Sequence, residues 1–187
     1  MKVYVIRHGQ SVNNREGLWT GWMDVPLTEK GEKDAELASK ILSGVNFDKI
    51  YSSDLIRARR TLEIALPGCE YETSPIFREV NVGSIAGKPI IPFTEKEKIA
   101  FGEKSYAAFG GETKEEFRGR VEGFMKKLEA SDLGNVAVFA HAGWQRTFLD
   151  LVIGINLPRE KVMCKNCTVG IFEYENGQWR LHSWINL

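Results

Sequence analysis

The stretch VYVIRHGQS, residues 3 to 11, ends a short apolar run abruptly in Arg7 and His8, with a glycine directly after them. Its β-branched and aromatic residues are typical of a buried strand. Charged residues are rarely core residues, so their place at the end of such a strand indicates a site. The stretch NVAVFAHAG, residues 135 to 143, repeats the arrangement with His141.

Two strand ends of this kind predict one shared site. In open α/β sheets, ligands bind outside the carboxyl ends of the strands, so His8 and His141 should converge there. A third predicted strand, residues 49–52, leads into a helix that carries Arg57. The helix after His141 adds backbone N–H groups at its positive end. Together with Arg7, these groups predict a pocket that attracts a dianion.

Strand and helix signals alternate along most of the chain. Further helices are expected near residues 29–43, after an N-cap at Ser53, from a capping box at Thr113 and over 143–152. A C-terminal hairpin of strands 168–174 and 179–185 is expected around Asn176-Gly177. We therefore expect residues 1–187 to form a single-domain three-layer α/β/α sandwich with a mostly parallel sheet of about six strands. Residues 81–112, richer in Gly, Pro and Lys, are expected to form an irregular excursion with one short helix, and they are a candidate lid.

The charge balance excludes some classes of partner. The 187 residues carry 25 Lys plus Arg and 25 Asp plus Glu, so the net charge is zero. Binders of nucleic acid or anionic membranes carry a basic excess. The apolar run after Lys2 is shorter than the hydrophobic region of a signal peptide, which has roughly 7–15 residues, and no run is long enough to span a bilayer. We expect a cytoplasmic protein that binds neither nucleic acid nor membrane.

The cysteines predict no disulfide framework or metal site. There are three of them, Cys69, Cys164 and Cys167, and the last two have C-x-x-C spacing. A zinc site would need a second pair of ligands, and a redox motif would open a helix, whereas this one precedes a strand. We expect a structural role for Cys164 and Cys167.

Six short motifs stand in order along the chain. They are Arg7-His8-Gly9-Gln10-Ser11 with Asn14; Gly21-Trp22-Met23-Asp24 with Pro26-Leu27-Thr28 and Gly31; Ser52-Ser53-Asp54-Leu55 with Arg57-Ala58 and Thr61; Phe77-Arg78-Glu79; Gly110-Gly111-Glu112-Thr113; and Ala140-His141-Ala142-Gly143. This series resembles the histidine phosphatase superfamily, which contains cofactor-dependent phosphoglycerate mutases and many phosphomonoesterases. Two positions depart from the pattern, because Ala86 stands where many members have Glu and Arg60 stands where Gln is common.

The resemblance implies a mechanism without a metal or other cofactor. His8 would attack phosphorus and form a phosphohistidine, while Glu79 would protonate the leaving oxygen and then activate water. His141 would help to hold the phosphoryl oxygens, whose charge fixed positive groups stabilise in the transition state. The residues expected to bind the substrate are Arg7, Asn14, Gly21, Arg57 and Ala142.

The resemblance covers both phosphatases and mutases. Mutases that resemble this family tend to be longer, with a larger basic insertion after the acid motif, whereas here that region is short and its lysines are offset by glutamates. A phosphomonoesterase for a small phosphorylated metabolite therefore fits better, acting as a monomer or weak homodimer. The α-ribazole phosphatase branch is one subfamily of similar size.

Three other functions stay open at this stage. One is phosphoryl transfer of the phosphoglycerate mutase type, and another is a non-catalytic module that binds a phosphorylated ligand. The third is a metal site made of two histidines, His8 and His141, and the Glu79 carboxylate. Fixed positive charge on Arg7 and Arg57 disfavours a cation there.

Overall fold

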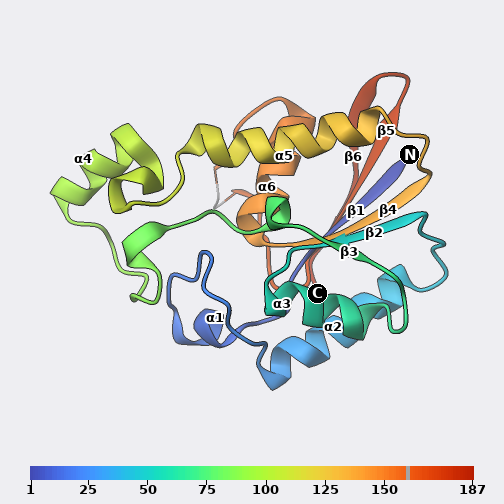
Figure 1. The fold of residues 1–187 in the computed structure, drawn as a ribbon, viewed down its shortest axis with the longest axis horizontal. Helices are drawn as coiled ribbons and strands as arrows, with labels where there is room; N and C mark the ends of the chain where they lie inside the picture. Colours follow the sequence, from blue (N-terminus) through green and yellow to red (C-terminus); the bar gives the residue numbers. More distant parts are fainter. Residues whose placement is uncertain (159–160) are drawn as a thin grey trace.

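A six-stranded sheet forms the centre of the computed structural model, which describes residues 1–158 and 161–187 (Figure 1). Its strand order is β3-β2-β4-β1-β5-β6, in which β3, β2, β4 and β1 run parallel and the C-terminal hairpin is antiparallel. The strands are β1 (Lys2–Arg7), β2 (Lys49–Ser52), β3 (Glu72–Thr73), β4 (Asn135–Ala140), β5 (Val169–Glu175) and β6 (Gln178–Ile185). The prediction of a single-domain, mostly parallel α/β fold is confirmed.

Helices cover both faces of the sheet. The α-helices are α1 (Val12–Glu16), α2 (Glu29–Leu42), α3 (Ile56–Ala65), α4 (Glu95–Lys104), α5 (Lys114–Glu129) and α6 (Ala142–Ile153). Because side chains alternate along a strand, Val3 and Val5 of β1 pack in a core with α5 and α6, whereas Tyr4 and Ile6 pack with α2 and α3. Figure 1 shows these two helical layers on opposite sides of the sheet.

The helix starts follow local capping, with one difference from the sequence prediction. Thr28 caps α2 and Thr113 caps α5, each accepting a backbone N–H three residues on. Ser53 does not cap α3, which begins at Ile56 with its N–H bound to the carboxylate of Asp24. A side chain distant in sequence has therefore taken the role predicted for a local one.

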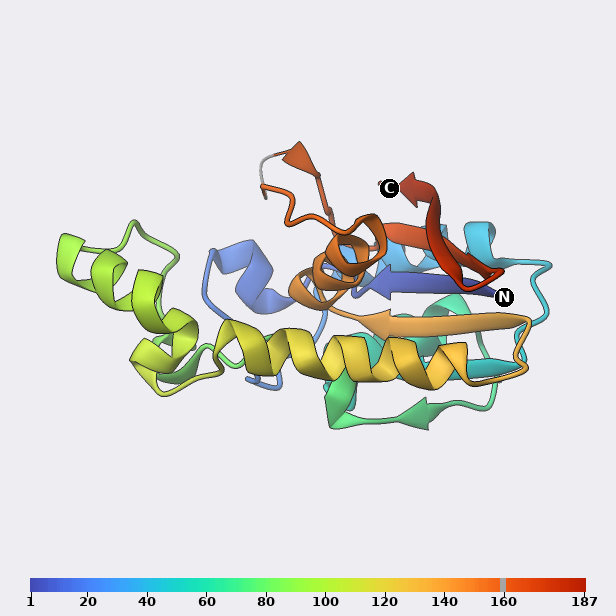
Figure 2. The same ribbon diagram turned by 90° about the horizontal axis from the view of Figure 1, so that it is seen from above.

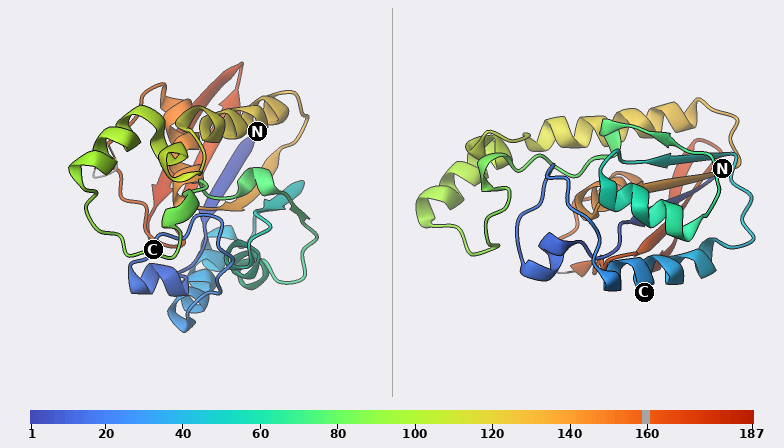
Figure 3. Two further views of the ribbon diagram at one scale, coloured as in Figure 1. Left: turned by 60° about the vertical axis from the view of Figure 1, so that its left-hand side comes forward. Right: turned by 60° about the horizontal axis from the view of Figure 1, so that its bottom comes forward.

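The excursion over residues 81–112 extends beyond the carboxyl ends of the parallel strands. It contains the 3₁₀ turns Gly83–Ile85 and Ser105–Phe109 as well as α4, and no residue of α4 is buried. In Figures 2 and 3, α4 lies at one end of the molecule, and in Figure 2 the arrowheads of β1 and β4 point toward that end. The excursion is therefore placed to border a site at the sheet edge. Within the described residues, no helix has the length and apolar character needed to cross a membrane.

The glycine after His8 allows a close approach of two backbones. A Cβ at Gly9 would lie 2.3 Å from the carbonyl oxygen of Gly31, and a Cβ at Gly31 would lie 2.1 Å from the carbonyl oxygen of Gln10. The turn after β1 is thus pressed against the first turn of α2. This contact holds His8 against the rest of the fold.

Gly31→Ala is expected to lower the free energy of unfolding by about 1–3 kcal/mol or more, because backbone atoms must move to admit the methyl group. Urea unfolding would measure the loss. Gly119→Ala in α5 is the matched control, since nothing lies within 4 Å of its added Cβ. That change should stabilise the helix by about 0.5–1 kcal/mol. Equal stability of the two variants would contradict the close-packing argument.

Candidate active site

The two strand–histidine ends meet at one edge of the sheet. Arg7 ends β1 and pairs in parallel register with Ala140, the last residue of β4, so His8 and His141 follow side by side. Their ring centroids are 5.1 Å apart. The convergence predicted from the sequence is therefore present in the structure.

The geometry of His8 leaves one ring nitrogen for chemistry. Its Nδ1 lies 2.6 Å from the carbonyl oxygen of Gly9, and since a carbonyl only accepts, Nδ1 carries the proton. The lone pair is then on Nε2. Burial, followed by the positive charges of Arg57 and Arg7, holds the pKa of His8 well below 6.5. The imidazole is thus neutral at physiological pH, as a nucleophile must be.

Two arginines supply fixed positive charge. Arg57 is 1% exposed and donates from Nη1 to the carbonyl of Met23 (2.7 Å) and from Nη2 to that of Gly21 (2.8 Å). Burial lowers its pKa to about 10, which keeps it protonated at neutral pH. Arg7 donates from Nη1 to the carbonyl of Cys164. Both guanidinium groups line the cavity in front of His8 and are held by backbone carbonyls.

His141 packs beside the His8 ring and is not among the residues that line the cavity. It is fully buried, and neither of its ring nitrogens has a hydrogen-bond partner among residues 1–158 and 161–187. Burial, and then the charge of Arg57, holds its pKa well below 6.5. Buried polar atoms are normally bonded, so two such nitrogens beside His8 fit contact with a ligand at this site.

The other expected binding residues also lie at the cavity. Asn14 accepts at Oδ1 from the N–H of Ser11 (3.2 Å) and from Nδ2 of Asn166 (3.1 Å), which leaves its own Nδ2 to face a ligand. Gly21 lines the wall, and so does Ala142, the first residue of α6. A backbone N–H at a helix start favours an anion.

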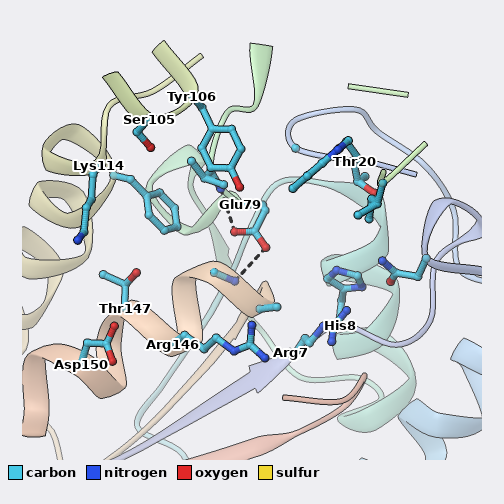
Figure 4. Close-up of a pocket in the computed structure, with 18 of the residues that line it drawn as sticks. Arg7, His8, Thr20, Glu79, Ser105, Tyr106, Lys114, Arg146, Thr147 and Asp150 are labelled. Carbon is cyan, nitrogen blue, oxygen red and sulfur yellow. Dashed lines mark hydrogen bonds between the residues drawn. The ribbon is translucent and has the colours of Figure 1, made fainter. Parts of the chain in front are cut away.

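Glu79 is oriented by two backbone N–H groups. Its Oε2 accepts from Gly143 (3.0 Å) and its Oε1 from Val80 (2.9 Å), as the dashed lines in Figure 4 show. The neighbouring Arg78 pairs with Asp54 instead, at 2.6 Å. Glu79 is therefore not half of a surface ion pair with Arg78, and its carboxylate lines the cavity.

An ion pair between Arg120 and Glu112 positions the segment that carries Glu79. Arg120 of α5 donates to the carbonyl oxygens of Ile76 (2.7 Å), Arg78 (2.9 Å) and Glu79 (2.9 Å). The same guanidinium pairs with Glu112 at 2.8 Å. The sequence motif contained Glu112, but nothing in the sequence indicated its partner, because the two meet only in the folded chain.

The cavity has a volume of about 460 Å³ and extends well beyond His8. Its lining includes residues that the sequence reasoning missed, namely Arg146, Thr147 and Asp150 on α6 and Lys114 on α5 (Figure 4). Residues 142, 143, 146, 147 and 150 follow the three- and four-residue spacing of one helix face. The same spacing is visible in the sequence after His141, and it could have indicated which residues of this helix face the site.

The geometry does not resemble a metal centre. In residues 1–158 and 161–187, no group of three or more His, Cys, Asp or Glu side chains is arranged to hold a metal ion. A divalent cation at His8 and His141 would also lie beside the guanidinium groups of Arg7 and Arg57, which repel it.

The C-x-x-C segment touches this site through its backbone. Its two thiols are free and buried, and burial raises the pKa of Cys167 to about 12. The N–H of Cys167 donates to the carbonyl of His8. A protonated, enclosed thiol of this kind is unreactive, which agrees with a structural role.

A neutral, backbone-oriented imidazole beside the buried Arg57 and the partly buried Arg7 defines an α/β protein suited to phosphoryl chemistry. The chain belongs to the histidine phosphatase superfamily (branch 1), whose family model matches residues 3–187.

The similar proteins carry the names of phosphoglycerate mutases or of a phosphatase. The probable phosphoglycerate mutase GpmB of Photorhabdus laumondii is 27% identical, over 99% of this chain and 90% of its own. The structure of a phosphoglycerate mutase from Thermus thermophilus has a TM-score of 0.76 at 28% identity, covering 100% and 99% of the two chains. An Escherichia coli structure with the provisional name alpha-ribazole-5'-P phosphatase reaches 0.83 at 24% identity, with 100% and 96% covered, a likeness of fold alone. Family membership thus supports enzymatic phosphoryl chemistry.

The two buried histidines predict a pH-dependent stability. Unfolded, each titrates near pH 6.5, whereas the native pKa values lie well below that. Below pH 6.5 the unfolded state therefore binds more protons, and stability falls as the pH falls. Between about pH 7.5 and about pH 5.5, each histidine should lower the free energy of unfolding by about 1 kcal/mol.

Urea unfolding at the two pH values would measure this loss. His141→Asn should remove about half of the histidine contribution to the pH dependence. His182→Asn is the control, because His182 is exposed on β6 and should leave the dependence unchanged. Equal dependence in wild type and His141→Asn would contradict a buried neutral His141.

Proposed function

We propose that the protein is a phosphomonoesterase that hydrolyses a small phosphorylated metabolite through a phosphohistidine on His8. The observation that carries the proposal is the hydrogen bond from His8 Nδ1 to the Gly9 carbonyl, which leaves Nε2 unprotonated beside two arginines. We propose the cytoplasm as its compartment and a monomer or weak homodimer as its assembly.

The proposed reaction has two steps. Nε2 of His8 attacks phosphorus, the bond to the ester oxygen breaks, and Glu79 gives that oxygen its proton. The phosphoryl oxygens are held by Arg7 and Arg57, with Asn14 Nδ2 and the Ala142 N–H as further donors and Gly21 in the wall. His141, which is buried beside His8 with two unpartnered ring nitrogens, is the third group proposed to hold them. The Glu79 carboxylate then takes a proton from water, which attacks the phosphohistidine and releases phosphate and neutral His8.

A mutase is the second candidate, because relatives matching nearly the whole chain carry that name. In a mutase the phosphohistidine passes its phosphoryl group to another hydroxyl group instead of to water. The two reactions share the first step and differ only in the acceptor. An experiment on the acceptor therefore separates them.

The experiment is a screen of phosphate monoesters that follows free phosphate, with 3-phosphoglycerate included and its conversion to 2-phosphoglycerate measured separately. Release of phosphate from at least one ester, without isomerisation, is the expected result. Isomerisation faster than hydrolysis would establish the mutase. Binding of esters with neither reaction would establish the non-catalytic module.

A further inference from the structure

One part of the cavity wall is aromatic. Trp19, Phe101 and Tyr106 all line the cavity, and they come from two segments distant in sequence. The centroid of Tyr106 lies 5.9 Å from that of Trp19 and 4.9 Å from that of Phe101, edge to face in both cases. Phe93 stacks on Trp19 at 6.1 Å and supports the wall from behind. The wall is thus one connected cluster of rings.

This wall keeps apolar surface turned toward the cavity. Trp19 and Phe101 are only partly buried, and Ile90, which also lines the cavity, is 56% exposed. A volume of about 460 Å³ falls in the range of pockets that enclose whole organic ligands, about 300–1,000 Å³. A phosphoryl group needs only the end beside His8. The remaining space is therefore suited to the alcohol part of an ester.

The position of Glu79 gives the direction in which that alcohol part extends. If Glu79 protonates the leaving oxygen, the ester oxygen lies on its side of phosphorus. Figure 4 shows Tyr106 above Glu79, while Lys114 and Asp150 lie off to one side, Asp150 beyond Arg146. The first atoms after the leaving oxygen therefore meet aromatic rings before they meet charged groups.

We propose, resting on the function proposed above, that the substrate is a phosphate monoester of an alcohol with a flat aromatic or comparably bulky apolar body. The rings of Trp19, Phe101 and Tyr106 bind this body, and burying both surfaces supplies the affinity. Small hydroxy acid phosphates, which lack such a body, leave the wall exposed to water and bind weakly.

Binding of two phosphonates tests the proposal without requiring turnover. Ethylphosphonate and 2-phenylethylphosphonate differ only in the phenyl group, and isothermal titration gives the two dissociation constants. The phenyl compound should bind about 10- to 100-fold more tightly, as expected for burying one aromatic side chain. A ratio near one would overturn the proposal.

Two variants of α4 test whether the tighter binding of the phenyl compound depends on the aromatic wall. Phe101→Ala should reduce the ratio of the two dissociation constants about 5-fold or more and leave ethylphosphonate binding unchanged, because only the ring contact is lost. Ile99→Ala is the matched control, since Ile99 is 64% exposed and does not line the cavity. A ratio unchanged in Phe101→Ala, or reduced equally in both variants, would contradict the assignment.

A third ligand tests whether the cavity prefers a substrate with a carboxylate to one with an aromatic body. If 3-phosphonopropionate binds more tightly than 2-phenylethylphosphonate, Lys114 and Arg146 select a carboxylate and the proposal is wrong. Failure of the hydrolytic function gives a different result, because the phosphonates would then still differ in affinity while no ester released phosphate. The two hypotheses can therefore fail separately.

Discussion

His8→Ala is expected to lower phosphate release on the order of 10⁴-fold or more, because the atom proposed to accept the phosphoryl group is lost. The fold should survive, since the side chain lies at the end of β1 and the apolar cores on both faces of the sheet lie elsewhere. Circular dichroism and urea unfolding would verify that the variant is folded. Steady-state release from 4-nitrophenyl phosphate would measure the loss.

The covalent intermediate gives a sharper test than the rate. Brief incubation with a ³²P-labelled ester and an alkaline quench should leave label on the wild-type protein that acid removes, as expected for a phosphoramidate. His8→Ala should carry none. His182→Ala is the control, because this exposed histidine lies on β6 and should label like wild type. Label on a serine, or robust activity in His8→Ala, would contradict the nucleophile.

Much of the fold was predictable because its signals are local. The apolar run of β1 and the run before His141 indicate buried strands by composition alone, and a parallel sheet brings their carboxyl ends together whatever the intervening chain does. The Asn176-Gly177 turn is equally local, since both residues have the positive φ that such hairpins need, 50° and 77°. Arg7, His8 and His141 could thus be placed before any coordinates.

The rest of the site depends on contacts between distant segments. Asp24 reaches the start of α3 across 32 residues, and Arg120 holds the Glu79 backbone across 41. The aromatic wall likewise joins Trp19 to Tyr106. Periodicity and motif spacing report on neighbours within a few residues, so these contacts had no signal in the sequence. The contacts of Arg120 position the backbone of Glu79, and those of Trp19 and Tyr106 shape the cavity wall.

Glu79→Gln is expected to slow phosphorylation by alkyl phosphates about 10²–10⁴-fold and to spare phosphorylation by 4-nitrophenyl phosphate. An alkoxide is a strongly basic leaving group that needs a proton, whereas nitrophenolate is weakly basic and leaves without one. Glutamine preserves the shape of the side chain but has no acidic proton to give. Thermal unfolding of the variant would verify that the segment held by Arg120 remains folded.

The second step should slow for both substrates, because the same carboxylate is proposed to activate water. Rapid mixing with 4-nitrophenyl phosphate should then show a burst of nitrophenol followed by a slow steady state in Glu79→Gln. Rapid-quench experiments with excess alkyl phosphate should show no burst of released alcohol in Glu79→Gln, because its phosphorylation step is slow as well. Equal losses in phosphorylation for both substrates, or no loss for either, would mean that Glu79 is not the acid and that a carboxylate in residues 95–116 has to be tested.

Gly143→Ala gives an independent change at the same contact. A Cβ at Gly143 would lie 2.2 Å from Oε1 of Glu79, which is the movable end of a side chain rather than backbone. The carboxylate should therefore shift while the fold is kept. Since proton transfer requires hydrogen-bond reach of the leaving oxygen, this variant should also lose alkyl phosphate turnover more than nitrophenyl phosphorylation. A uniform loss for both substrates would indicate instead that the added methyl group obstructs the phosphoryl site beside the Ala142 N–H.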